Sequence, residues 1–251
     1  MALFKSGNPV LSEKSFSDSL IDLQTERMTV RGTLNKFGLL FIMMLGAASF
    51  TWSLFYQGVN VMPWAIGSAI GGFVLALVMT FKKAWSPYLA LGYGLLEGLF
   101  LGAISVVFNA AFAESYPGII MQAVLLTLGT AAAMFLLYQF RVIQATPTFK
   151  KVILIATAGI ALFYLIAMVL RLFGIQMPYL HDNSAIGIGI SLFVVTIAAL
   201  NLILDFDRIE QGAAHGAPKY YEWFSAFGLL VTLVWLYLEM LRLLSKLASR
   251  D

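Results

Sequence analysis

The chain has 251 residues, of which 60% are hydrophobic and 12% are charged, and it contains no cysteine. Soluble domains carry about 25% charged residues, so this composition excludes an ordinary soluble domain. Without cysteine, the chain cannot form a disulfide framework, a thiol nucleophile or a thiolate metal site. The net charge of +3 comes from basic residues in particular loops, which indicates membrane topology and not a nucleic-acid partner.

Seven apolar runs are long enough to cross a bilayer as helices, which takes about 20 residues each. Only helices and closed barrels satisfy the backbone in lipid, and continuous runs of this length favour helices. The runs cover Phe37–Tyr56, Met62–Phe81, Pro87–Phe112, Gly118–Phe140, Val152–Phe173, Ala185–Leu204 and Glu222–Leu247. The sequence therefore predicts an all-α integral membrane protein, with a polar tail at residues 1–36 and seven transmembrane helices within residues 37–251.

Lysine and arginine are unevenly distributed among the predicted loops. The tail at 1–36 and every second loop after it hold twelve of them, whereas the alternate loops hold only Arg171. The positive-inside rule then predicts a cytoplasmic N-terminus. Seven crossings place the C-terminus outside, where Arg242, Lys246 and Arg250 depart from that rule. A last helix that does not fully cross, or a re-entrant sixth segment, is the alternative.

Small residues recur at helical spacing in two of the predicted helices. The third helix carries Gly94, Gly98 and Gly102, and the second carries Gly67 and Gly71. Such ridges let a neighbouring helix approach closely, so we expect tight helix packing here.

Glu97 lies beside the glycine ridge, near the middle of the third predicted helix. Carboxylates at this depth are usually paired, protonated or exposed to a water-filled cavity. A structural hydrogen bond and a role in transport are both open for Glu97.

Acidic residues gather where the sixth apolar run ends. The polar side chains there are Asn201, Asp205, Asp207 and Glu210. Acidic groups at a helix C-terminus oppose the macrodipole, so they are unfavourable there unless they are paired or used. Arg208 and Lys219 are close enough in sequence to pair with them at a gate. We expect an acidic cytoplasmic mouth; a merely solvated helix end is the alternative.

The last predicted helix carries a stripe of polar and small residues along one face. Steps of three and four residues join Glu222, Ser225, Gly228, Thr232, Trp235, Glu239 and Arg242. A carboxylate at mid-bilayer costs roughly 2.5–3.5 kcal/mol on insertion scales, so Glu239 is predicted to face protein or water. The stripe indicates a helix that other elements surround along its length.

These features together resemble the transmembrane Bax inhibitor motif family, and within it the bacterial YccA-like branch. Besides seven short-looped helices, the resemblance rests on Asp205 followed by Ile209 at the end of the sixth helix. It also rests on ERMTVRGTLNKFGLL at 26–40, LLEGLFLGAIS at 95–105 and LYLEMLRLL at 236–244. The resemblance covers the chain from about residue 26. It implies a fold in which the last helix is central and wrapped by the other six.

The resemblance also implies a function, a pH-sensitive calcium leak whose pore is closed by aspartates on the sixth and last helices. The first aspartate falls on Asp205. The position of the second, ten residues before Arg242, holds Thr232, which cannot titrate. Asp207 or Glu222 could replace the missing carboxylate at the same mouth.

We therefore expect a calcium leak channel in a bacterial inner membrane, with Asp205 as the first gate residue and proton sensor. Glu97 and Glu239 would offer polar groups to the ion deeper in the bundle. Glu239 lies about 10 Å along the helix from Thr232. Calcium is expected as the permeant ion, with no cofactor and no stable metal site. Oxygen ligands suit calcium, but no loop has the alternating ligands of a tight site.

The alternative function is a non-conducting regulator of a membrane-bound protease or of a stress response, contacted through the tail at 1–36. The resemblance implies such a restraint of a protease, which is known for bacterial family members, and also the suppression of cell death, which is known for eukaryotic ones.

An enzyme is not expected. His181 and His215 lie in predicted loops without a second ligand, and Asp205 and Asp207 point roughly 200° apart on one helix, so they form no catalytic dyad.

Overall fold

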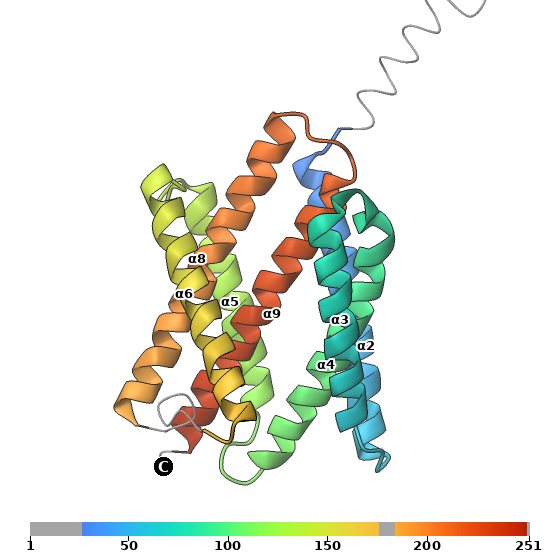
Figure 1. Ribbon diagram of the computed structural model, residues 1–251, viewed down its shortest axis with the longest axis vertical. Helices are drawn as coiled ribbons and strands as arrows, with labels where there is room; N and C mark the ends of the chain where they lie inside the picture. The colour runs from blue at the N-terminus through green and yellow to red at the C-terminus, as the bar shows by residue number, and fades with distance from the viewer. Residues whose placement is uncertain (1–26, 176–183, 250–251) are drawn as a thin grey trace, which may run out of the picture.

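The computed structural model describes residues 27–175 and 184–249, and within these residues it contains seven long helices and no sheet (Figure 1). The helices are α2 (Val30–Tyr56), α3 (Met62–Phe81), α4 (Ser86–Ala111), α5 (Ile119–Gln139), α6 (Pro147–Leu172), α8 (Ala185–Ala214) and α9 (Tyr221–Ala248), with a 3₁₀ helix, η2 (Lys83–Trp85), before α4. All seven are long and apolar enough to cross a membrane. The predicted all-α, seven-helix membrane architecture is therefore confirmed. Most of the predicted tail, residues 1–26, lies outside the described residues.

The first helix begins earlier than its apolar run. It starts at Val30 and not at Phe37, because Thr29 caps its N-terminus. The Thr29 hydroxyl oxygen accepts a hydrogen bond from the Gly32 N–H at 2.9 Å. A threonine in this position satisfies one of the backbone donors that a helix start leaves open. The last residues of the stretch predicted as tail are thus helical.

The sixth membrane helix, α8, continues ten residues beyond the predicted Leu204 and ends at Ala214. His215 follows, and then Gly216 takes a left-handed conformation (φ 66°) that favours glycine at a helix end. The expectation that the acidic residues stand at the C-terminus of this helix is therefore wrong. Hydropathy located the end too early because the last turns of α8 are polar.

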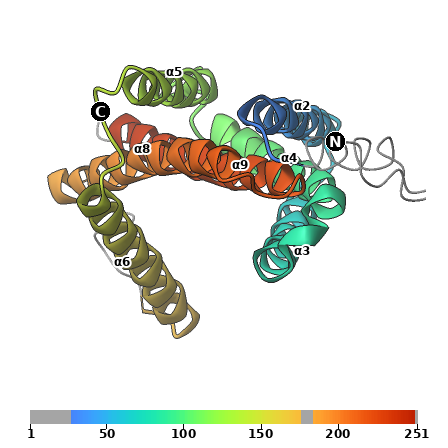
Figure 2. The same ribbon diagram turned by 90° about the horizontal axis from the view of Figure 1, so that it is seen from above.

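The last helix, α9, is the most buried of the seven helices. Of its most apolar stretch 61% is buried, compared with 11% in α6. Helices α2, α4, α5 and α8 pack directly on α9, whereas α3 packs on α4 and α6 packs on α8 (Figures 1 and 2). Four helices thus cover α9 directly, whereas the resemblance implied that all six wrap it; α3 and α6 form an outer layer. We call the end of the bundle that carries the start of α2, η2 and the α8–α9 loop the basic end (Figure 1).

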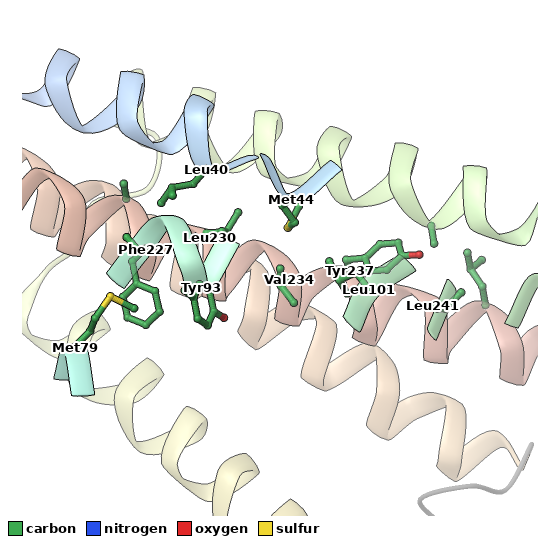
Figure 3. Packing of buried hydrophobic residues seen from close by; sticks show 14 of the residues in the cluster. Leu40, Met44, Met79, Tyr93, Leu101, Phe227, Leu230, Val234, Tyr237 and Leu241 are labelled. Atoms are coloured by element: carbon green, nitrogen blue, oxygen red, sulfur yellow. The ribbon is translucent and has the colours of Figure 1, made fainter. Parts of the chain in front are cut away.

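The largest hydrophobic cluster lies between α9 and the helices α2, α3, α4 and α5 (Figure 3). Tyr93 of α4 meets Phe227 of α9 edge to face, with ring centroids 4.7 Å apart. Leu40 and Leu230 are fully buried beside them. Because lipid tails are as apolar as these side chains, close van der Waals packing holds such helices together. The cluster fixes the position of α9 against α4.

The glycine ridge of α4 lies directly against the backbone of α2. A Cβ atom at Gly98 would collide with the carbonyl oxygen of Met44, and one at Gly102 would collide with that of Ala48. The predicted close approach is confirmed, and the neighbour is α2. In α3 the prediction is wrong for Gly67, where a Cβ would meet nothing within 4 Å, and at Gly71 a Cβ would meet only a leucine side chain, at 3.0 Å.

Substitution of Gly98 by alanine is expected to lower the free energy of unfolding by about 1–3 kcal/mol, the usual cost of overpacking. The added methyl group would push α2 away from α4 at a backbone contact that cannot yield by a rotamer change. Thermal unfolding in detergent measures the effect. Gly129→Ala is the matched control, because a Cβ there meets nothing within 4 Å. Equal melting temperatures for the two variants would contradict the close approach.

Candidate functional site

Asp205 of α8 and Thr232 of α9 are in direct contact. The Thr232 hydroxyl donates a hydrogen bond of 2.6 Å to Asp205 Oδ2. Arg208, one turn further along α8, places its Nη1 atom 3.8 Å from Asp205 Oδ1. Only 14% of the Asp205 side chain is exposed, whereas Arg208 is 68% exposed. The two positions that the resemblance assigns to the gate therefore face each other, although one of them holds a hydroxyl group.

Two cavities meet at this contact. The intramembrane cavity, of about 530 Å³, lies between α3 and α4 on one side and α8 and α9 on the other. The basic-end cavity, of about 420 Å³, is lined by the ends of α8 and α9 that their loop joins, by Met28 before α2 and by Lys83 of η2. Asp205, Arg208 and Gly228 line both cavities. The Asp205–Arg208 pair thus stands at the boundary between a space near the loop and a space within the bundle.

The intramembrane cavity also brings together polar residues from different helices. Glu97 of α4 and Asn201 of α8 line it together with Asp205 and Thr232. The Asn201 amide nitrogen donates to the Thr157 hydroxyl at 2.8 Å, which ties α8 to α6. Sequence spacing indicated that each of these residues is unusual, but only the packing of α4 against α9 places Glu97 in one cavity with Asp205.

The other acidic residues of α8 face neighbouring helices and not the cavities. Asp207 forms an ion pair of 2.5 Å with Lys150 at the start of α6. Glu210 pairs with Arg141 at 2.9 Å and accepts a hydrogen bond from the Tyr138 hydroxyl at the end of α5. Asp207 therefore does not take the place of the second aspartate. Its carboxylate holds α6 against α8.

Glu222, the other candidate for that place, is fully buried at the start of α9 and is also away from Asp205. Its carboxylate accepts hydrogen bonds from the Thr29 N–H and hydroxyl, at 2.8 and 2.9 Å, and from Lys219 at 2.8 Å. Lys36 forms an ion pair with it as well. Of the two basic residues predicted to pair at the gate, Arg208 contacts Asp205, whereas Lys219 contacts Glu222.

Glu239 lies in a separate polar cluster toward the opposite end of α9. It is 2% exposed and accepts hydrogen bonds from the Tyr164 hydroxyl at 3.1 Å and from Arg242 at 3.0 Å. As predicted, this carboxylate faces protein and not lipid. Nearby, Lys246 donates to the Gly187 carbonyl oxygen at 2.9 Å. Because Arg242 and Lys246 bind groups inside the protein, their departure from the charge rule does not require a different topology.

No three histidine or acidic side chains gather as metal ligands anywhere in residues 27–175 and 184–249. The ring of His215 lies 2.7 Å from the Gln211 carbonyl oxygen at the end of α8. His181 lies outside the described residues.

The fold defines a multi-pass helical membrane protein in which an α8–α9 contact borders two cavities. A family model described as Bax inhibitor 1 like matches residues 8–249, and the chain belongs to this family. No curated protein and no solved structure gives a significant match. The family predicted from the residues is confirmed, while the bacterial YccA-like branch stays a prediction.

Proposed function

We propose that this protein is a pH-sensitive calcium leak channel whose gate is the Asp205–Thr232 contact. The observation that carries the proposal is that Asp205 and Arg208 line both the basic-end cavity and the intramembrane cavity. An ion that moved between these spaces would pass the only carboxylate that they share. The proposed function is non-enzymatic, with calcium as the permeant ion and no bound cofactor.

The gate would work through the charge of Asp205. An ionised carboxylate at the boundary attracts a cation, which replaces Arg208 as its partner during passage. A protonated carboxyl group has no net charge, so it no longer attracts the cation or Arg208 electrostatically. We therefore expect flux to rise when Asp205 loses its proton, that is, as the pH increases. Glu97 offers a second acidic group within the intramembrane cavity.

The proposed setting is a bacterial inner membrane with the basic end in the cytoplasm. The lysine and arginine residues of the α3–α4, α5–α6 and α8–α9 connections support this orientation, because such residues are retained on the cytoplasmic side. The basic-end cavity would then open toward the cytoplasm and the intramembrane cavity would lie deeper.

Calcium flux into proteoliposomes, measured from about pH 6 to about pH 8, tests the proposal. Asp205→Asn keeps the shape of the side chain and removes its charge. We expect about tenfold less flux at the upper end of this range, which corresponds to about 1.4 kcal/mol in the barrier, and a flat pH profile. Asp207→Asn is the control, because Asp207 pairs with Lys150 away from the cavities. Absence of flux from folded wild-type protein would overturn the leak.

A second candidate is a non-conducting regulator of a membrane-bound protease or of a stress response. It is favoured by the attachment of Arg27–Thr29 to the α8–α9 loop, which joins the tail to the core of the protein. Deletion of residues 1–26 separates the two functions. A regulator that acts through its tail would lose its effect, whereas a leak would keep its flux.

A further inference from the structure

We infer that Arg27–Thr29 form a strap that closes the basic-end cavity, and that release of this strap, by whatever engages the tail before it, opens the cavity to water. The effect on calcium flux rests on the proposed function. The strap itself rests on contacts that are independent of any ion. These contacts involve the backbone, a buried methionine and a buried carboxylate.

The backbone of the strap lies along the α8–α9 loop as an added strand would. Arg27 forms an antiparallel bridge with Pro218, and the Met28 N–H donates to the Ala217 carbonyl oxygen at 2.7 Å. Extended segments that pair in this way gain affinity from main-chain hydrogen bonds, and they can detach as a unit. The strap is thus held on a loop surface and is not part of a helix.

Met28 makes the strap a wall of the basic-end cavity. Its side chain is 3% exposed, and it lines this cavity together with Asp205 and Arg208. A Cβ atom at Gly212 of α8 would lie 2.9 Å from the Met28 sulfur, so the absence of a side chain at Gly212 provides the space for Met28. Removal of the strap would therefore remove an apolar cover from the space that leads to Asp205.

Glu222 locks the strap to the first turn of α9. The carboxylate takes both donors of Thr29, and Lys36 and Lys219 neutralise its charge. A Cβ at Gly32 would overlap the Glu222 carboxylate, so the first turn of α2 is shaped around it. Release of the strap would remove the two Thr29 donors and leave the buried carboxylate with Lys36 and Lys219, and the loss of hydrogen bonds to a buried charged group is unfavourable. The strap is therefore expected to detach together with a displacement of Glu222.

The same lock connects the strap to the gate helix. Glu222 and Thr232 are on one continuous helix, α9, and Thr232 contacts Asp205. Displacement of Glu222 frees the first turn of α9 while Met28 leaves the cavity. The strap thus controls both the opening of the basic-end cavity and the anchoring of the helix that bears one half of the gate.

The absence of native cysteine allows a direct test with introduced thiols. Ser225→Cys places one thiol in the lining of the basic-end cavity. Its rate of reaction with a charged, water-soluble methanethiosulfonate reports access from water. In this background Gly32→Ala, which displaces the Glu222 carboxylate, is expected to raise the rate about tenfold, equivalent to about 1.4 kcal/mol in the opening equilibrium. Gly38→Ala on the same helix is the control, since a Cβ there meets nothing within 4 Å.

A disulfide staple provides the opposite change. Residues directly opposite in an antiparallel pair have Cα atoms about 4.5–5.5 Å apart, within the range that a disulfide spans. The double variant Arg27→Cys, Pro218→Cys, oxidised in proteoliposomes, should therefore hold the strap shut. Calcium flux through the double variant is expected to fall several-fold on oxidation and to recover with a reductant. Oxidation should not change the flux through either single-cysteine variant. Titration of free thiols verifies that the disulfide has formed.

The outcomes separate the strap from the leak. Faster labelling in folded Gly32→Ala protein supports the strap even if no variant conducts calcium, in which case the leak alone fails. Unchanged labelling in folded Gly32→Ala protein overturns the strap. Where this variant does not fold, the staple decides: equal flux before and after reduction, in a protein that conducts, overturns the strap.

Discussion

Substitution of Arg242, whose side chain is 38% exposed, by methionine is expected to lower the free energy of unfolding by about 1–3 kcal/mol, the cost of leaving a buried polar group without one of its partners. Glu239 is 2% exposed, and Arg242 lies 3.0 Å from it while also donating to the Tyr164 hydroxyl at 2.5 Å. Methionine approximates the volume of the aliphatic part and removes the nearest positive charge, so the carboxylate keeps only the hydrogen bonds from Tyr164 and Trp235 and a weaker interaction with Lys246. Because Tyr164 belongs to α6, the contact between α6 and α9 would weaken as well. Denaturation in detergent micelles measures the loss.

Two further variants identify the cause of this loss. Arg171→Met removes a basic residue from the exposed end of α6 and is expected to change stability little. The double variant Arg242→Met, Glu239→Gln removes the unpaired charge but keeps an amide that can accept from Tyr164. It should recover most of the stability. If the double variant is as unstable as Arg242→Met, packing of the arginine stem matters and the buried charge does not.

Substitution of Thr232 by aspartate is expected to make calcium flux much more sensitive to pH. Thr232 Oγ1 lies 2.6 Å from Asp205 Oδ2, so an aspartate here would place two carboxyl groups within hydrogen-bond distance. Two carboxylates this close share one proton and repel each other once it is lost. We expect the pair to hold the gate shut while it keeps the proton and to push α8 and α9 apart when it does not. Flux measured across the same pH range should therefore rise more steeply than in the wild type.

Thr232→Asn is the matched control, because asparagine has the shape of aspartate without its charge. It can donate a hydrogen bond to Asp205 as threonine does, so its pH profile should follow that of the wild type. A profile of Thr232→Asp that matches Thr232→Asn would show that the two carboxyl groups do not interact. The Asp205–Thr232 contact would then be structural.

The seven membrane helices could be predicted from the sequence because length and hydropathy are local properties. The helix boundaries at Val30 and Ala214 could not be predicted from hydropathy. The Thr29 cap sets the first boundary and the polar last turns of α8 set the second, and neither feature is apolar. The family pattern assigns Asp205 and Thr232 to the proposed gate, and the structure brings these two residues into contact. The resemblance succeeded there because positions on two adjacent antiparallel helices keep a constant register.

The partners of the acidic residues could not be predicted from spacing. Glu222 binds Thr29 and Lys36, which precede it by 193 and 186 residues. Asp207 was expected at the gate with Asp205, yet these two side chains point roughly 200° apart on one helix and reach different neighbours. A helical stripe shows that a face is polar, but it does not show which helix will cover that face.

The sequence by itself determined the membrane class, the number of helices, the family and the unusual polar residues of the last two helices. Each of these follows from composition, from periodicity along one helix or from the order of motifs. Only the tertiary structure decided that Glu97 and Asp205 share one cavity, that Glu239 is closed off with Tyr164 and Arg242, and that Glu222 holds the N-terminal segment. The physical reason is that these contacts join helices far apart in the chain, so the packing of helix against helix selects them and no local pattern records it.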